Sequence, residues 1–124
     1  MLQAYSTDVT VTALAPVPFN SLAVSKGCSE TLETPTTVAL KRCGVYEVSV
    51  NASAAASQTV QLYRDGVALP QAVSTGTAMG FTCLVQVNEN SCKCNPCTAP
   101  VRLQVVATGA GTLTDASITV TKIA

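Results

Sequence analysis

Six cysteines are the residues of this 124-residue sequence best suited to chemistry: Cys28, Cys43, Cys83, Cys92, Cys94 and Cys97. The last four lie close enough in sequence to bind one zinc ion through four thiolates, with Lys93 offsetting part of their charge. Their spacing provides only one C-x-x-C pair, Cys94 to Cys97, whereas a standard zinc ribbon has two. A thiolate zinc site at Cys83, Cys92, Cys94 and Cys97 is therefore an alternative, and we predict no resident metal.

Disulfide bonds are the favoured state of the six cysteines. Six is an even number, so three bridges can form, in any of about fifteen pairings. A bridge from Cys28 to Cys43 would close a modest loop, and each bridge would add about 2 to 4 kcal/mol of stability. Buried thiols without a bridge are the third alternative. Redox catalysis is disfavoured, because no βαβ pattern surrounds the C-x-x-C pair.

The sequence contains no histidine. This absence excludes a Ser-His-Asp triad, a Cys-His pair, an HExxH zinc site and any histidine proton shuttle. The seven acidic residues are scattered along the chain, whereas a paired-carboxylate glycosidase needs two acids that converge in a cleft. We therefore predict that the chain is not an enzyme and that it has no catalytic residues and no cofactor.

The surface is expected to carry unusually little charge. Charged residues make up 11% of the sequence, against roughly 25% in an ordinary soluble domain. Seven basic and seven acidic residues give a net charge of zero, and aromatic residues are few, so nucleic acid is not an expected partner. Because a neutral domain tends to self-associate, we expect partner subunits to cover much of its exterior.

No stretch of about 18 apolar residues is present, so no membrane partner is expected. The first eight residues lack the basic and apolar regions of a secretory signal. We therefore expect synthesis in the cytoplasm, with any oxidation of the cysteines following release from the cell.

Alternating apolar and polar residues predict about eight short β-strands. Residues 44–52 show the clearest pattern, with Tyr46, Val48 and Val50 on one face and polar side chains on the other. Further strands are expected at residues 7–14, 19–24, 36–41, 58–64, 67–69, 81–87, 101–108 and 112–123.

Turn residues separate these strands. Asp65 and Gly66 predict a tight hairpin, and residues 109–111 predict a second one. Pro70 is expected to stop the strand that follows the first hairpin. Residues 52–57 are interpreted as a loop or one helical turn, and residues 88–100 as a cysteine-rich loop. Such spacing is typical of an all-β, antiparallel jelly-roll sandwich, and the length predicts a single domain over residues 1–124.

Three runs of residues resemble a known family: GVYEVSVN at 44–51, VQLYRDGVALP at 60–70 and LTDASITVTKI at 113–123. They are similar to the tumour-necrosis-factor-like and complement-like jelly roll, and in particular to the C-terminal domain of collagen-like glycoproteins of bacterial spore surfaces. The resemblance covers residues 36–124. It implies a homotrimer, with five residues lining the three-fold axis if they are not core residues of one chain: Tyr46, Val48, Ile118, Val120 and Ile123.

The segment at residues 17–28, VPFNSLAVSKGC, looks like the opening of small jelly-roll proteins encoded by tailed phages and prophages of gut Firmicutes. No collagen-like stalk precedes the domain, so the spore-surface role is not expected to carry over. The resemblance implies a phage virion structural protein on the virion surface: a homotrimeric capsid decoration or head-fibre protein that binds the major capsid protein. Residues 1–18 are expected either to reach the capsid as an extended arm or to form the first strand of the sandwich.

The alternative function is a receptor-binding or carbohydrate-binding head on a tail fibre or host surface. Such a head is expected to be the end of a longer chain and to carry clustered, exposed aromatic side chains for sugar stacking. The sequence, with no tryptophan and only five other aromatic residues, does not predict such a cluster.

Overall fold

The computed structural model describes residues 1–27, 29–87 and 101–124, and these ranges contain nine β-strands and no helix. Accordingly, no helix in the described ranges is long and apolar enough to cross a membrane. All strand pairs are antiparallel, which confirms the predicted fold class. The strands are β1 (Leu2–Val11), β2 (Ala15–Pro16), β3 (Ser21–Ser25), β4 (Glu30–Thr34), β5 (Thr37–Leu40), β6 (Gly44–Arg64), β7 (Val67–Val87), β8 (Val101–Ala107) and β9 (Gly111–Lys122).

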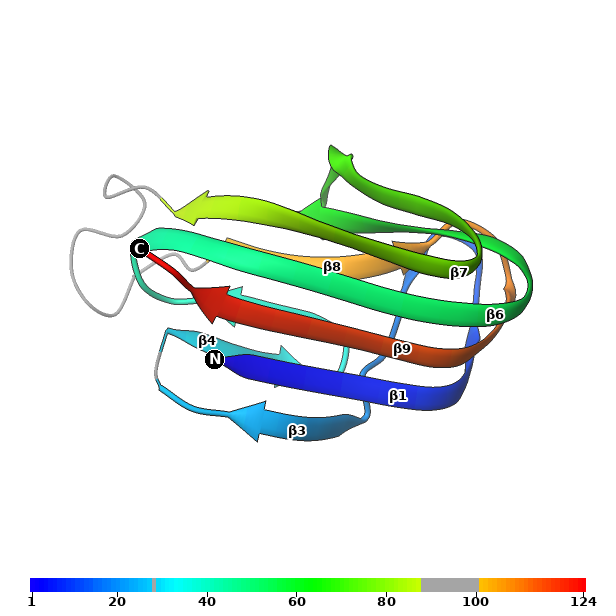
Figure 1. Cartoon of the computed structure of the whole chain (residues 1–124), viewed down its shortest axis with the longest axis horizontal. Coiled ribbons are helices and arrows are strands. Elements are labelled where there is room, and N and C mark those ends of the chain that lie inside the picture. Colours follow the sequence, from blue (N-terminus) through cyan, green and yellow to red (C-terminus); the bar gives the residue numbers. More distant parts are fainter. Residues whose placement is uncertain (28, 88–100) are drawn as a thin grey trace.

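The strands form one sheet in the order β3-β1-β9-β6-β8-β5-β4, which folds over into two layers (Figure 1). The first layer contains β3, β1, β9, the first half of β6 and the second half of β7. The second layer contains β4, β5, β8 with the short β2, the second half of β6 and the first half of β7. The two long strands therefore belong to both layers.

The bend in β6 and β7 falls where the sequence suggested a loop or one helical turn. The register of β6 against β7 shifts between Ser53 and Gln58, and Gly76, opposite Gln58, has a φ of +142°. Bulges and glycines allow a strand pair to curve sharply. The prediction of a loop or turn at residues 52–57 is wrong, because the small side chains there let the backbone bend while the strand continues.

Pro70 lies inside β7 and does not end it, contrary to prediction. Its position explains why the strand tolerates it. The β6–β7 register shifts between Gln61 and Tyr63, and β7 pairs with β6 alone among the described strands. Proline is accepted at bulges and on edge strands because its missing N–H is not needed there.

The predicted hairpin at Asp65 and Gly66 is confirmed. Both residues have positive φ, 50° and 82°, as a two-residue turn between twisted strands requires. The turn is also tied to β8, because the Asp65 carboxylate accepts a hydrogen bond from the Arg102 N–H at 2.9 Å and the Asp65 N–H donates to the Arg102 carbonyl at 2.8 Å.

The predicted second hairpin at residues 109–111 is wrong. β8 and β9 pair with opposite halves of β6, so the segment between them crosses from the second layer to the first. The Gln58 side chain holds this crossing, donating to the Gly109 carbonyl at 2.7 Å and accepting from its N–H at 2.9 Å. Gln58 is one of few buried polar side chains among the described residues, and both ends of its amide are hydrogen-bonded.

The core lies between the two layers and follows the predicted alternation. On β6, Tyr46, Val48 and Val50 point inward, while Glu47 and Asn51 are exposed. The Tyr46 hydroxyl donates to the Arg42 carbonyl at 2.7 Å, so the buried ring keeps a partner for its polar end. Opposing positions come from β1, β5, β8 and β9, notably Leu2, Leu40, Leu103, Leu113 and Ile118.

The first residues form an integral strand and not a separate arm. β1 pairs with β9 along its length, and Leu2–Tyr5 pair with β3 on the other side, so this segment is built into the first layer. Val17 is fully buried, and the Ser6 hydroxyl donates to the Pro18 carbonyl at 2.6 Å. This corrects the suggestion that residues 1–18 reach out to a capsid.

The glycines at the two ends of β6, Gly44 and Gly66, differ in how much space surrounds them. At Gly44, with a φ of +146°, a methyl group would collide with the Ala124 carbonyl and would lie 2.7 Å from the Lys122 Cε; at Gly66, with a φ of +82°, a methyl group would meet nothing within 4 Å. We expect Gly66→Ala to cost about 1 to 2 kcal/mol through backbone strain alone, and Gly44→Ala to cost more. Urea unfolding of both variants at one protein concentration measures the difference, and an equal or smaller loss for Gly44→Ala would contradict the packing described here.

Candidate functional site

The described cysteines lie at or near the core. Cys83 sits on β7 opposite Val48 and is buried, forming no disulfide within the described residues, and Cys43 is half-buried just before β6. Burial raises the pKa of the Cys83 thiol. Among the described residues no group of three or more histidine, cysteine or acidic side chains could hold a metal ion.

The remaining cysteines, Cys28, Cys92, Cys94 and Cys97, lie outside the described residues. Both the zinc site and the disulfide pairings therefore stay predictions. What the structure adds is the place of Cys83, whose side chain faces the apolar core.

Four of the five side chains expected at a three-fold axis are core residues of a single chain. Tyr46, Val48, Ile118 and Val120 are at most 1% exposed. A side chain with no accessible surface cannot line an interface, so the assignment of these four is corrected. Ile123, which is 52% exposed, is the one that offers surface to a neighbouring subunit, and its role there stays a prediction.

β7 forms a long edge without charge. Its 21 residues include no lysine, arginine, aspartate or glutamate. Within the described residues it pairs with β6 only, which leaves its other side open. Several apolar side chains along it reach the surface: Val67, Val73 and Leu84. We call this feature the β7 edge.

Near the chain termini, the outer face of the first layer carries a small apolar patch. Leu84 is 58% exposed and lies opposite Glu47, while Ile123 is hydrogen-bonded through its N–H to the Val45 carbonyl at 2.8 Å. Glu47 pairs with Leu84 on one side and with Thr121 on the other. Since side chains two residues apart on a strand point to the same face, Val45 and Ile123 lie on the same face as Leu84. We call Leu84 and Ile123 the terminal patch.

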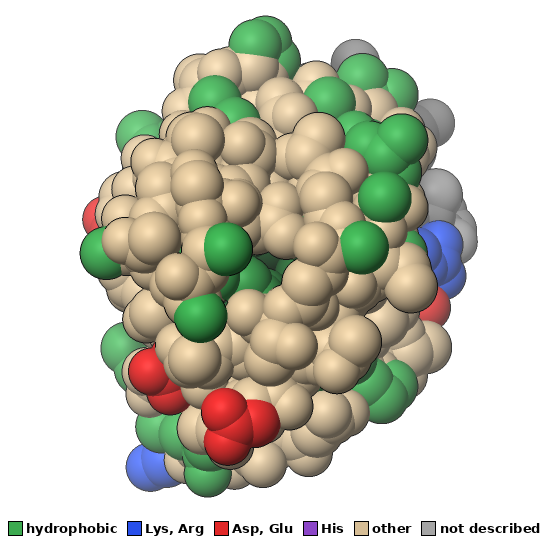
Figure 2. Space-filling model, turned by 90° about the vertical axis from the view of Figure 1, so that its right-hand side faces the viewer, with side chains coloured by type: hydrophobic (Ala, Val, Ile, Leu, Met, Phe, Trp, Pro, Cys, Tyr) green, Lys and Arg blue, Asp and Glu red, His purple; other side chains and the backbone are tan. Residues whose placement is uncertain are grey.

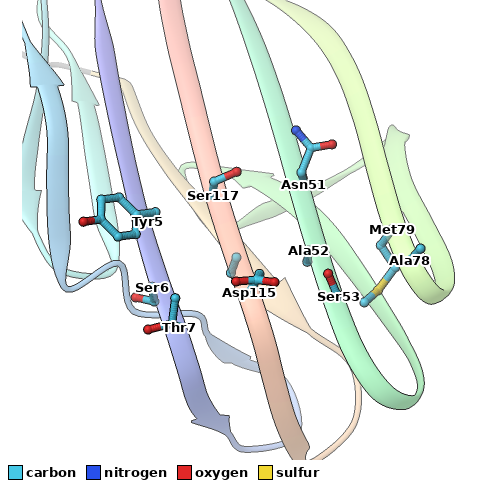
Figure 3. Close-up of a pocket in the computed structure, with 11 residues that line it drawn as sticks. Tyr5, Ser6, Thr7, Asn51, Ala52, Ser53, Ala78, Met79, Asp115 and Ser117 are labelled. Atoms are coloured by element: carbon cyan, nitrogen blue, oxygen red, sulfur yellow. The ribbon is translucent and has the colours of Figure 1, made fainter.

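At the opposite end of the same face lies a polar depression of about 410 Å³. Strand register builds it from two neighbouring rows of side chains, one row from Tyr5, Ser117 and Asn51 and the next from Thr7, Asp115 and Ser53. Figure 3 shows these residues arriving from β1, β9 and β6, with Ala78 and Met79 of β7 at the side of the depression. We call the six polar residues the polar depression.

The side chains of the polar depression are not engaged with one another. Within residues 1–27, 29–87 and 101–124, the side chains of Tyr5, Thr7, Asn51, Asp115 and Ser117 make no hydrogen bond or ion pair. Of the described residues that line the depression, only Asp115 and Tyr5 have ionisable side chains. The depression thus presents one carboxylate, one amide and several hydroxyls beside an aromatic ring.

Sequence reasoning did not identify this depression. Asp115 is exposed at the surface. Tyr5, Asn51 and Asp115 are separated by dozens of residues, and only the register of three strands brings them together. No motif in the sequence signals such a grouping.

The single buried carboxylate among the described residues belongs to Glu30. Its Oε1 is bound by the Met1 ammonium group, which also donates to the Lys26 carbonyl at 2.8 Å. No second carboxylate of the described ranges is buried beside it. The pair therefore joins β1 to β4 and does not form an acid–base dyad.

No protein-family model matches the sequence, and neither does any curated protein. Solved structures do match along the whole chain. The globular domain of zebrafish complement 1qA aligns at 12% identity over 99% of this chain and 96% of that one, with a TM-score of 0.77. Murine APRIL aligns at 10% identity over 98% of each chain, with a TM-score of 0.67, and rabbit GITRL at 10% identity over 100% and 95%, with a TM-score of 0.61.

These likenesses establish the class of fold. The chain is an all-β jelly roll of the kind shared by tumour-necrosis-factor-like and complement-1q-like domains. In particular, it spans nearly the full length of the zebrafish complement 1qA domain. This confirms the fold that the three sequence runs implied, while the resemblance to spore-surface and phage proteins is not tested by these structures.

Burial of Cys83 predicts low reactivity in the folded protein. The thiolate is the nucleophile, and the raised pKa of Cys83 keeps the thiolate population low at neutral pH. Burial also limits the access of a reagent to the sulfur. At pH 7.5 we expect iodoacetamide to label Cys83 at least about ten-fold more slowly in the native protein than in urea, as measured by peptide mass spectrometry. Equal labelling rates would show that Cys83 is not held in the core.

Proposed function

We propose that this chain is a non-enzymatic structural protein that assembles as a homotrimer on the surface of a tailed-phage virion, as a capsid decoration or head-fibre protein. The single observation that carries the trimeric part is the β7 edge, a 21-residue edge strand without one charged residue. The virion setting is supported by the resemblance of residues 17–28 to small phage proteins.

An open edge strand of this length is a hazard for a protein that stays monomeric. Soluble proteins usually protect edges with charged residues, short strands or covering elements, because unpaired N–H and C=O groups can join another sheet. β7 has proline and bulges but no charge. Covering it with further copies of the chain removes the hazard without leaving a charged group to be desolvated.

Three-fold symmetry fits two different surfaces that meet head to tail and close into a ring. The first half of the β7 edge, with Val67 and Val73, and the terminal patch, with Leu84 and Ile123, provide two such surfaces on one subunit. Figure 2 views the end of the molecule where β6 and β7 bend, opposite the terminal patch, and charged side chains are few on this end too. A surface dominated by hydroxyl, amide and small apolar groups can be buried between subunits at little electrostatic cost.

A non-enzymatic role agrees with the composition and with the site. The chain has no histidine, and the polar depression holds one carboxylate without a second acid or base beside it. The similar structures named above are a complement domain, APRIL and GITRL, which supports a binding or assembly role.

The capsid contact must come from the body of the domain. β1 is part of the first layer, so the major capsid protein, the partner that we propose, would meet a folded surface and not a separate arm. The receptor-binding or carbohydrate-binding head remains the second candidate function, and the polar depression is the observation that favours it.

Oligomeric state tests the trimer directly. In sedimentation equilibrium at micromolar concentration, we expect three times the 12.7 kDa subunit mass. Leu84→Asp or Ile123→Asp should shift the protein toward monomer, because each places a charge in the terminal patch. Leu22→Asp is the matched control: Leu22 is also about half exposed but lies on β3, at the other edge of the first layer.

Far-ultraviolet circular dichroism shows whether each variant stays folded. A wild-type monomer at this concentration would remove the basis of the proposal. Dissociation by Leu22→Asp together with an intact trimer in the other two variants would move the interface to the opposite edge.

Negative-stain microscopy tests the virion role separately. The particles come from a tailed phage of a Firmicutes host, and the phage genome encodes the chain. The gene for the chain is deleted from this phage, and purified protein is then added to the mutant particles. We expect regular knobs on the heads. Labelling of tail tips would favour the receptor-binding head, and unlabelled particles would contradict a virion role while leaving the trimer measurement unaffected.

A further inference from the structure

We propose that the polar depression, formed by Tyr5, Thr7, Asn51, Ser53, Asp115 and Ser117, binds a neutral monosaccharide unit. This inference does not rest on the phage setting or on the trimer. It rests on the grouping of unengaged polar side chains with an exposed aromatic ring at one edge of the group.

The shape of the depression suits a small, flat ligand. Its volume of about 410 Å³ lies in the range of small-molecule sites. Neighbouring strands are about 5 Å apart, and successive side chains on one face of a strand are about 7 Å apart. Side chains from β9 and β6 can therefore reach a single six-membered ring at the same time, and the Tyr5 ring lies at the β1 side of the depression (Figure 3).

The chemistry of the side chains suits a polyol. The Asp115 carboxylate accepts hydrogen bonds, the Asn51 amide both donates and accepts, and the Ser117 hydroxyl does either. A sugar hydroxyl likewise donates and accepts. Tyr5 is 42% exposed and offers an apolar ring face to the C–H groups of a sugar, with its own hydroxyl at the rim.

These groups are available without the loss of existing bonds. In the described part of the chain, neither Asp115 nor Asn51 nor the Tyr5 hydroxyl has a hydrogen-bond partner. Binding therefore exchanges water for ligand and breaks no interaction of the fold. On the β-sheet the backbone positions are fixed by pairing on both sides of β9, so the site is largely formed in advance.

The charge of the depression selects among ligands. Asp115 repels phosphate, sulfate and acidic sugars, and none of the described residues that line the depression is a lysine or arginine that would attract them. A metal cation is disfavoured as well, because calcium requires six or more oxygen ligands and only one carboxylate is present. A neutral hexose or N-acetylhexosamine matches the remaining chemistry.

The proposed trimer contact does not cover this site. Asp115 pairs with Ser53, whereas Ile123 of the terminal patch lies opposite Val45, eight residues further along the strand. At about 3.3 Å per residue, the two ends of the face are roughly 26 Å apart. The polar depression and the terminal patch can therefore work independently.

Saturation-transfer NMR of the full chain tests the site with glucose, galactose, mannose, N-acetylglucosamine and N-acetylneuraminic acid. We expect at least one neutral sugar to bind with a Kd on the order of millimolar, and the acidic sugar not to bind. Tyr5→Ala and Asp115→Asn should each weaken binding about ten-fold or more, while Tyr5→Phe keeps the ring and most of the affinity.

Asp8→Asn is the matched control. Asp8 is an exposed carboxylate on β1 with a φ of +50°, a conformation that asparagine also tolerates, and it lies outside the depression. We expect the Asp8→Asn variant to bind the neutral sugar with the affinity of the wild type.

Three results would overturn the proposal. The first is the absence of saturation transfer to every neutral sugar when the sugar concentration is 20 times the expected millimolar Kd. The second is binding that survives both Tyr5→Ala and Asp115→Asn. The third is dissociation of the oligomer by these two variants in sedimentation, which would assign the depression to a subunit contact. The trimer measurement on the wild type stands apart from all three.

Discussion

The pairing of β6 with three partners is the constraint on which the rest of the structure depends. Its first half pairs with β9, its second half with β8, and its other side with β7 throughout. One strand can serve two layers only if it bends, and the bend falls at small residues with a register shift. Because β7 follows β6 around the bend, it becomes the edge of both layers. The long open edge is thus a direct consequence of the way the fold closes.

The fold shows where the low charge of the sequence matters: on the open edge strand and on the outer face of the first layer. Charges are usually what protects an edge strand, and β7 has none. The outer face of the first layer also carries little charge. It consists largely of rows of serine, threonine and asparagine, and Glu47 and Asp115 interrupt these rows. A hydroxyl can be buried against another hydroxyl or against a ligand for a modest cost, whereas an unpaired charge cannot. The same composition therefore suits both the subunit contact and the sugar site that we propose.

Much of the fold could be predicted from local pattern. The alternation at Tyr46, Val48 and Val50 identified β6, and Asp65-Gly66 identified its hairpin, because both signals lie within a few residues. The bend at residues 52–57 and the crossing at 109–111 could not be predicted, since glycine and alanine there mark a change of layer and not a reversal of direction. The polar depression was equally hidden, because strand register, and not sequence distance, places Tyr5 beside Ser117 and Asn51.

Period-two alternation cannot by itself tell a core from an interface. Tyr46, Val48, Ile118 and Val120 form the apolar half of the pattern, and the structure buries them inside one subunit. Whatever a neighbouring subunit contacts on the first layer must then come from the other half of the pattern, which consists mostly of hydroxyls and amides, with the carboxylates of Glu47 and Asp115 and a few exposed apolar side chains such as Leu84 and Ile123. A contact of this kind gains little from apolar burial per unit area, so it needs backbone pairing along an edge to be stable. β7 provides that edge, which ties the assembly that we propose to the same bend that closes the fold.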